Sequence, residues 1–227
     1  AAIRSMDDAA LGECRALFTI SRSVAARLSR FNSLPGTPLY PPPHELGRYR
    51  TDAYGDYLFY AGRLERLKRV DLALEALARC RGGARLKIAG TGPLEGDLRR
   101  QAHRLGIEDR VDFLGFVSAD DLVALYASCR AAWYTPVDED YGYVTVESFL
   151  SHKPVLTTTD AGGPLEFVTD GVSGVVAPAE PGALAEAIDR LWAAPEASLR
   201  AMGEEGHARV ADITWDHVVD RLTETIR

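Results

Sequence analysis

Short apolar runs alternate with segments of helical periodicity along most of the chain. Each run is rich in β-branched, aromatic or leucine residues and is bounded by glycine, proline or aspartate, a pattern typical of strands. The predicted strands lie at residues 57–62, 84–90, 110–115, 131–134, 154–159 and 174–178. Helices are predicted between and after them at about 68–80, 93–105, 118–128, 142–151 and 181–193. This alternation predicts an α/β fold, a doubly wound, Rossmann-like parallel sheet with helices on both faces.

The first fifty residues follow a different pattern. A helix is expected at about 6–16, a strand at 17–20 and a second helix at about 21–30. After these elements, Pro35, Pro38 and three consecutive prolines at 41–43 are expected to prevent helix formation and to break strand pairing.

The change of pattern suggests three parts. Residues 1–50 are predicted to be the end of one α/β unit and a proline-rich linker, and residues 51–213 the main domain. Residues 214–227 are predicted to form a terminal helical segment. Because the chain begins without methionine, within what looks like the earlier unit, we expect it to be a piece of a longer protein.

The composition argues against several classes of protein. Of the 227 residues, 46% are hydrophobic and 26% are charged, a mixture that can bury a sizeable core. No apolar run reaches the roughly 18 residues of a membrane-spanning helix. The net charge of −7 disfavours a nucleic-acid partner, which would be expected to select a basic face.

The cysteines and histidines predict neither a disulfide framework nor a metal site. Cys14, Cys80 and Cys129 lie about fifty residues or more apart, without a CxxC pair. The five histidines are scattered as well. A reducing cytoplasm is the simplest compartment for such a chain.

Two cations flank the turn that follows the first strand of the main domain. Gly62 lets the backbone turn, and Arg63 and Lys68 lie five residues apart before a predicted helix. Only three of the 26 basic residues are lysines, so a lysine here is informative. Two cations and a helix N-terminus would attract a diphosphate. The alternative is a solvated basic helix start, which Arg66 and Arg69 favour.

A glycine-rich turn follows the second strand. The segment from Gly90 to Gly96 has the spacing GxGxxxG, whereas dinucleotide-binding proteins have GxGxxG. Pro93 suits an ordinary first helical position, and this simpler interpretation is favoured. A second glycine pair, Gly162 and Gly163, would permit either a close approach to a ligand or a plain tight turn.

The acidic segment after the fourth strand carries the most information. On the predicted helix, Glu147 is in register with Tyr143, Val144 and Leu150, which places its carboxylate on an apolar face. A buried carboxylate requires partners. A ribose diol would supply them, as in dinucleotide sites, and a structural ion pair with an arginine would do so equally well.

A second acid, Glu139, precedes Glu147 by eight residues. Its expected position is a loop above the strand end, where it could hold another part of a ligand. The alternative, favoured by charge alone, is a solvated acidic loop shared with Asp138 and Asp140.

Taken together, these segments resemble the C-terminal half of a GT-B glycosyltransferase of the retaining family four, the glycosyl transferases of group one. The resemblance rests on the E-x7-E pair together with segments in the expected order: Gly62-Arg63, Lys68, Gly90-Thr91-Gly92-Pro93, Phe113-Leu114-Gly115 and Gly162-Gly163-Pro164-Leu165-Glu166. Asp140 and Tyr141 depart from the family's usual Glu-Gly-Phe-Gly, and His152 stands where a small residue is common.

The resemblance implies roles for individual residues. Arg63 and Lys68 would hold the diphosphate of a nucleotide sugar and stabilise its charge without a metal or other cofactor. Glu139 would contact the donor sugar, and Glu147 the ribose. Further donor-binding positions would be Gly142, Tyr143 and Val144, whose backbone N–H groups would cap the phosphates, together with Gly62, Gly90 and Gly115, the last beside the base.

The resemblance also implies partners. The co-substrate would be a UDP- or GDP-sugar, and the leaving diphosphate would help to deprotonate the acceptor on the same face. The acceptor would bind to an N-terminal domain that is mostly absent here, so this chain would bind a donor but transfer sugar poorly. The segment from Trp215 to about Arg227 would cross back onto that domain. A peripheral membrane association through the missing half stays open.

Two other functions are consistent with the same fold. One is a non-catalytic module that binds nucleotide sugars, although the presence of Glu139, Arg63 and Lys68 disfavours it. The other is a NAD-dependent Rossmann enzyme, which the spacing at Gly90 and the lack of a clear acid after the next strand disfavour.

Overall fold

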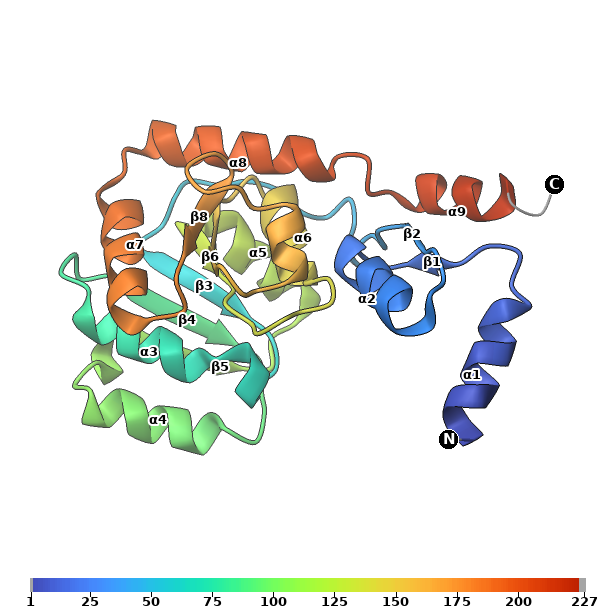
Figure 1. The fold of residues 1–227 in the computed structure, drawn as a ribbon. Coiled ribbons are helices and arrows are strands. Elements are labelled where there is room, and N and C mark those ends of the chain that lie inside the picture. Colours follow the sequence, from blue (N-terminus) through green and yellow to red (C-terminus); the bar gives the residue numbers. More distant parts are fainter. Residues whose placement is uncertain (1, 225–227) are drawn as a thin grey trace. The chain divides into compact units, whose positions relative to one another are not determined.

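The predicted parallel sheet is present in the computed structural model, which describes residues 2–224. Its strands are β3 (Tyr57–Ala61), β4 (Arg85–Ala89), β5 (Val111–Gly115), β6 (Ala131–Trp133), β7 (Val155–Thr158) and β8 (Gly174–Ala177). They lie in the order β5-β4-β3-β6-β7-β8, and every neighbouring pair is parallel (Figure 1). The predicted α/β class and all six predicted strands are confirmed.

Helices cover the sheet on both sides. They are α3 (Val70–Arg79), α4 (Glu95–Arg104), α5 (Ala119–Ser128), α6 (Tyr143–Leu150), α7 (Pro181–Ala193) and α8 (Glu196–Val210). Helix α3 packs against α4 and α7, and α6 packs against α8 (Figure 1). The five helices predicted in this region are present, and α8 was not predicted.

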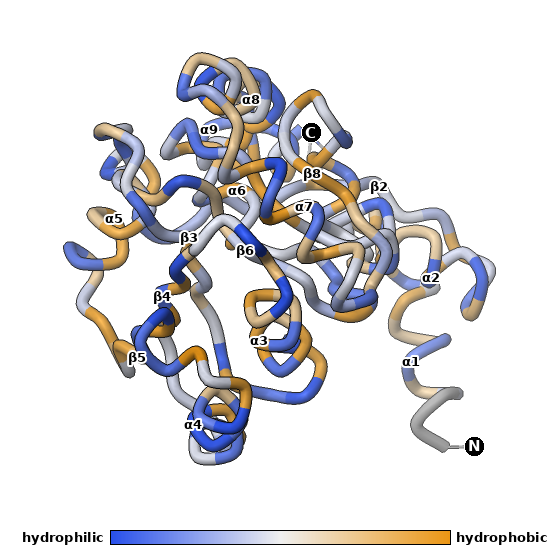
Figure 2. The backbone as a smooth tube through the Cα atoms, turned by 90° about the vertical axis from the view of Figure 1, so that its left-hand side faces the viewer, coloured by the Kyte–Doolittle hydropathy of each residue, from blue (hydrophilic) through white to orange (hydrophobic). Residues whose placement is uncertain are grey.

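The strands near the centre of the sheet are buried apolar runs because both faces of the sheet are covered there, whereas β4 and β5 also contain partly exposed charged residues. All five residues of β3 are buried, and Tyr60 and Trp133 are among the largest buried side chains. The outer helix α4 instead has only two buried residues, Leu98 and Ala102. Figure 2 shows the same contrast in hydropathy, because the tube is mostly blue along α4 and largely orange along β8.

The strand order reverses between β3 and β6. The chain runs outward from β3 to β4 and β5, and it then returns to place β6 on the other side of β3. Loops that leave the carboxyl ends of two such strands diverge and open a crevice, which is where open α/β sheets bind ligands. The loops after β3 and β6 carry the predicted cations and acids.

Two glycines explain why α8 escaped prediction. Gly203 and Gly206 weaken a helix in isolation, but here they allow α8 to approach its neighbours. A Cβ atom at Gly203 would lie 2.0 Å from the carbonyl oxygen of His152, and one at Gly206 would lie 2.2 Å from the Phe149 ring. Tertiary packing therefore overrides the local preference.

The chain divides into two compact units. One comprises residues 43–211 and contains the six-stranded sheet, and the other comprises the described residues up to Pro42 together with those from Asp212 onward. The sequence had suggested boundaries after residues 50 and 213. The second unit contains α1 (Ala2–Gly12), β1 (Phe18–Thr19), α2 (Arg22–Asn32), β2 (Thr37–Pro38) and α9 (Trp215–Glu224).

One expectation for this unit is wrong, because proline does not break the pairing of β1 with β2. Thr37 N donates to Leu17 O over 2.9 Å, and Leu39 N donates to Thr19 O over 2.7 Å. Pro38 lies between these two donors, where the parallel ladder needs no N–H group from it.

The predicted helix after Trp215 is present as α9, and the last residues of that prediction, 225–227, lie outside the described part of the chain. Its crossing towards an N-terminal domain stays a prediction. Among the described helices, none is both long and apolar enough to cross a membrane. The cytoplasmic location also stays a prediction.

Candidate functional site at the carboxyl edge of the sheet

Three glycines, Gly62, Gly90 and Gly115, lie side by side at the ends of β3, β4 and β5. Gly62 N donates to Ala89 O over 3.0 Å, and Gly90 N donates to Gly115 O over 2.7 Å. Gly90 has a φ of +134°, and a Cβ atom there would lie 1.9 Å from the carbonyl oxygen of Gly62. Only glycine fits such an approach of two backbones.

A cavity of about 310 Å³ lies at this edge. Its size falls within the usual range of small-molecule sites. The lining residues are Ala61, Gly62, Ala89, Gly90, Phe116, Val117, Leu122, Tyr143, Val144 and Glu147. The structure thus brings five predicted donor-binding residues, Gly62, Gly90, Tyr143, Val144 and Glu147, to one cavity.

Glu147 is the acid of this cavity, and two tyrosines hold its carboxylate. The Tyr126 hydroxyl donates to Oε2 over 2.8 Å, and Tyr49 donates as well. The predicted alternative of an arginine ion pair is wrong, because among the described residues the partners of this carboxylate are tyrosine hydroxyls. Burial raises the pKa of Glu147, and both hydrogen bonds act in the opposite direction by favouring the carboxylate.

The two tyrosines were missed by the sequence analysis. Tyr126 lies on α5 and Tyr49 precedes β3, so neither is near Glu147 in the sequence. Burial, followed by the charge of Glu147, raises the pKa of each phenol and keeps it protonated as a donor. A carboxylate has about four acceptor positions, so two such bonds leave it able to accept from a ligand.

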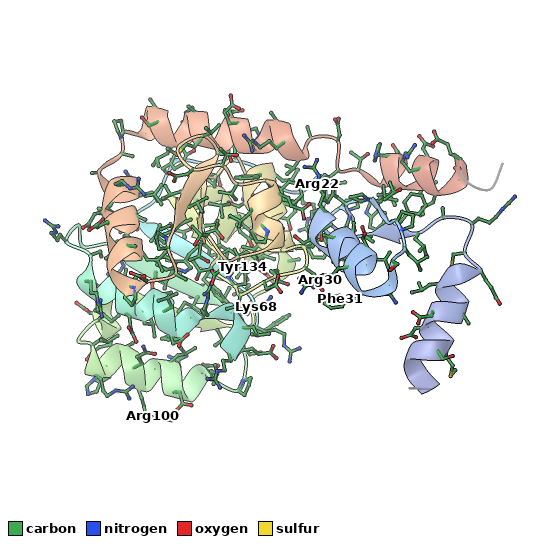
Figure 3. All side chains as sticks on the ribbon, in the orientation of Figure 1. Arg22, Arg30, Phe31, Lys68, Arg100 and Tyr134 are labelled. Carbon is green, nitrogen blue, oxygen red and sulfur yellow. The ribbon has the colours of Figure 1, made fainter. Side chains whose placement is uncertain are left out.

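Lys68 and Glu139 meet above the strand ends. Lys68 closes the short 3₁₀ helix η1 (Arg66–Lys68), and its ammonium group pairs with Oε2 of Glu139. Each side chain is 22% exposed. The Tyr134 hydroxyl donates to the same oxygen over 2.9 Å and lies 3.2 Å from the Lys68 ammonium (Figure 3). Glu139 is therefore not a solvated acid.

The structure does not bring Arg63 into this cluster. Its side chain is 76% exposed, and its guanidinium group pairs with Glu65 over 2.6 Å. The backbone is fixed instead, because the hydroxyl of the buried Tyr60 donates to the Arg63 carbonyl oxygen over 2.9 Å. Arg63 shares the loop after β3 with Lys68, and its role at a diphosphate stays a prediction.

Helix α6 begins beside this cluster. Gly142 precedes it with a φ of +84°, and a Cβ atom there would lie 2.7 Å from Cε1 of Tyr134. Tyr143 and Val144 open the first turn, where N–H groups have no acceptor within the helix. They lie at the positive end of the helix dipole, which suits an anion.

The loop that carries Glu139 is hydrogen-bonded to the loop that follows β7, which contains the glycine pair. Glu139 N donates to Ala161 O over 2.9 Å, and Gly163 N donates to Glu139 O over 2.7 Å. A Cβ atom at Gly162 would lie 2.5 Å from the carbonyl oxygen of Glu139. These glycines therefore permit a close approach to the acidic loop.

Arg69 is not part of a solvated helix start, and that interpretation of it is wrong. Its side chain is 15% exposed and donates to Thr135 O, Pro136 O and Thr158 Oγ1 at 2.7 to 2.8 Å. It also binds both carboxylate oxygens of Asp160, at 2.7 and 2.9 Å. The hydrogen bonds from Arg69 hold the pKa of Asp160 below its ordinary value. Arg69 thus ties η1 to the ends of β6 and β7.

Gly115 ends β5 with a φ of +66°, and no atom lies within 4 Å of a Cβ built on it. Next to it, Phe116 is 88% exposed and lines the cavity that contains Glu147. The predicted base position is therefore open and apolar. Within residues 2–224, no group of three or more His, Cys, Asp or Glu residues is placed to hold a metal ion.

Comparison with known proteins identifies the family. The model of the family described as glycosyl transferases group 1 matches residues 49–209. A D-inositol 3-phosphate glycosyltransferase of Mycolicibacterium paratuberculosis is 33% identical over 178 residues, which are 76% of this chain and 40% of that protein. An uncharacterized glycosyltransferase of Methanocaldococcus jannaschii is 32% identical over 137 residues, 59% of this chain and 35% of that protein.

Solved structures agree in fold. Anabaena HepE in complex with UDP and glucose has a TM-score of 0.82 at 24% identity, covering 94% of this chain and 63% of that one. The sucrose-phosphate synthase of Thermosynechococcus elongatus has a TM-score of 0.83 at 24% identity, covering 97% and 60%. The chain spans at most about two fifths of the length of the two glycosyltransferase relatives given above. With its family model, sheet topology and structural neighbours in agreement, the chain belongs to the glycosyl transferases group 1 family and has the Rossmann-like fold of a GT-B C-terminal domain.

Proposed function

We propose that this domain binds a UDP- or GDP-sugar and supplies the donor half of a retaining sugar transfer in a longer protein. The observation that carries the proposal is the cavity at the carboxyl edge of the sheet. It combines the glycines at the strand ends, the start of α6 and the tyrosine-bound carboxylate of Glu147. Apolar walls with a few fixed polar groups are typical of a nucleotide site.

Each part of the donor has a matching part of the site. The ribose hydroxyls would donate to the remaining acceptor positions of Glu147, which Tyr126 and Tyr49 hold in place. The base would lie over the open position beside Gly115, against Phe116. The diphosphate would bind at the first N–H groups of α6, within reach of the cation on η1.

The chemical step requires charge stabilisation at the diphosphate. As the bond from the sugar to the phosphate breaks, negative charge grows on the leaving oxygen, and Lys68 would stabilise it. Glu139 would hold hydroxyls of the sugar, and Arg63 would turn from Glu65 to the diphosphate. The leaving diphosphate would take the proton of the acceptor on the same face.

Two complexes of one structural neighbour support the choice of ligand. Anabaena HepE has been solved with UDP and with UDP-glucose, and its fold matches 94% of this chain. Transfer would require the acceptor-binding part of the longer protein, so we expect the isolated chain to be a poor enzyme. The family match also argues against the NAD-dependent alternative.

A titration with UDP, GDP, ADP and NAD tests the proposal. Isothermal calorimetry should show that UDP or GDP binds more tightly than NAD. Binding of NAD alone would overturn the proposed function.

The substitution Glu147→Gln should weaken UDP or GDP binding by about 1–3 kcal/mol, the scale for leaving buried partners unpaired. The glutamine retains the shape of the side chain but presents one acceptor oxygen in place of two. Calorimetry should show the loss for the nucleotide and little change for inorganic pyrophosphate, which has no ribose. The matched control is Glu75→Gln on α3, a partly exposed acid that does not line the cavity. A loss of equal size in the control would contradict the assignment.

The substitution Lys68→Ala should weaken a nucleoside diphosphate by about 1–2 kcal/mol more than the bare nucleoside, because the charge acts on phosphate oxygens. The same titration with UDP and uridine, or GDP and guanosine, measures this difference. Arg66→Ala removes the same charge from the same 3₁₀ helix at an exposed position and is the control. Equal losses for nucleotide and nucleoside would exclude a diphosphate role for Lys68.

A further inference from the structure

Tyr134 is a tyrosine that no part of the proposed mechanism uses. It follows β6 directly and is only 3% exposed, yet its hydroxyl reaches the two charged residues of the site. The hydroxyl donates to Oε2 of Glu139 over 2.9 Å and lies 3.2 Å from the ammonium nitrogen of Lys68. Figure 3 shows the labelled Lys68 and Tyr134 side chains coming together from separate elements.

The ring of Tyr134 is fixed by packing at the start of α6. Its Cε1 atom occupies the space that a side chain at Gly142 would need. Burial, followed by the charge of Glu139, raises the pKa of Tyr134, so its hydroxyl stays protonated near neutral pH. The group is therefore a constant, neutral donor to the carboxylate.

Lys68 is a different kind of partner because the proposed ligand competes for it. In the structure its ammonium group pairs with Glu139. A diphosphate at the start of α6 would attract the same group. If Lys68 turned to the phosphates, Glu139 would lose a charged partner at the moment when it must hold the sugar. A largely buried carboxylate without a donor is costly.

We propose that Tyr134 is a positioning residue, whose hydroxyl keeps Glu139 directed at the donor sugar while Lys68 engages the diphosphate. The inference rests on the proposed function and adds to it a residue that acts through Glu139. Tyr134 is not among the residues that line the cavity assigned to the nucleotide. Removal of the Tyr134 hydroxyl should therefore weaken only the contribution that the sugar makes to donor binding.

Calorimetry on the full chain with Tyr134→Phe tests this role. Wild type and variant are titrated with two ligand pairs, UDP with UDP-glucose and GDP with GDP-mannose. The comparison uses the pair that wild type binds more tightly. The ratio of the two dissociation constants, nucleotide over nucleotide sugar, isolates the contribution of the sugar. We expect this ratio to fall about tenfold in the variant, the scale of one hydrogen bond to a charged group. The affinity for the nucleotide alone should change by less than about twofold.

Two comparisons separate positioning from a general structural role. Tyr57→Phe removes another hydroxyl bond within the same domain, from Tyr57 to Leu125 O over 2.8 Å, and should leave the ratio unchanged. In a Glu139→Ala background, Tyr134→Phe should have no further effect on the ratio, because the residue through which it acts is gone.

The outcomes distinguish the two proposals. If wild type binds neither nucleotide, the proposed function fails and takes this inference with it. If wild type binds and the ratio is unchanged in Tyr134→Phe, only the positioning role is wrong. Equal losses for nucleotide and nucleotide sugar, or loss of the fold in Tyr134→Phe alone, would assign the hydroxyl to stability and also overturn the inference.

Discussion

An alanine at position 90 is expected to destabilise the sheet-containing domain by about 4 kcal/mol. Two costs combine at this residue. The backbone has a φ of +134°, which L side chains rarely adopt, and the new Cβ atom would lie 1.9 Å from the Gly62 carbonyl oxygen. Neither backbone can move freely, because Gly62 is hydrogen-bonded to Ala89 and Gly90 is hydrogen-bonded to Gly115. Urea unfolding of Gly90→Ala against wild type measures the difference in free energy.

Gly115→Ala is the matched control for crowding. Gly115 also has a positive φ, +66°, and lies on the adjacent strand, but no atom is within 4 Å of its Cβ position. The expected loss is only the backbone cost, about 1 kcal/mol. Comparable losses at the two positions would show that the approach of the Gly62 and Gly90 backbones is not what selects glycine here.

Much of the fold could be predicted because the strands of a parallel sheet have a simple hydrophobic pattern in the sequence. The strands near its centre are buried on both faces, so they are short apolar runs, as at Tyr57–Ala61. Helix α8 has no such pattern. Gly203 and Gly206 serve contacts with residues about fifty positions earlier, and such contacts cannot be inferred from local propensity.

The site was predictable in outline for a topological reason. Loops that follow parallel strands gather at one edge of the sheet, and this places Lys68, Glu139 and Gly90 there without any knowledge of side-chain direction. The direction in which each side chain points could not be predicted in this way. Arg63 follows a strand too, but its side chain is at the surface on Glu65.

The partners of the acids could not be predicted either. Tyr126 binds Glu147 from α5, and Tyr134 binds Glu139 from the end of β6. Tyrosine is common in buried cores, so nothing in its local sequence distinguishes a packing role from a hydrogen-bonding one. The distinction depends on which hydroxyl reaches a carboxylate, and that is set by the packing of α5 and β6 against the rest of the domain.

Arg69→Met should destabilise the same domain by about 3 kcal/mol and loosen the loop that carries Glu139. Methionine has a similar reach but donates no hydrogen bond. Its presence would leave the carbonyl oxygens of Thr135 and Pro136 without their charged donor, and Asp160 without its bidentate partner. Urea unfolding at neutral pH measures the loss of stability. The control is Arg66→Met, at an exposed position on η1.

The pH dependence gives this prediction its sharpest form. Arg69 lowers the pKa of Asp160 in the folded protein. The ion pair therefore stabilises the fold above the ordinary aspartate pKa of about 3.9, and this stability is lost as the pH falls through the lowered value. Because Asp160 is 48% exposed, solvent screens its ion pair with Arg69. The hydrogen bonds from Arg69 to the two carbonyl oxygens therefore account for most of the lost stability. The difference in the free energy of unfolding between wild type and Arg69→Met should become smaller below about pH 4 but should not vanish. If Arg66→Met and Arg69→Met lost equal stability at every pH, Arg69 would be the solvated cation that its sequence context suggested.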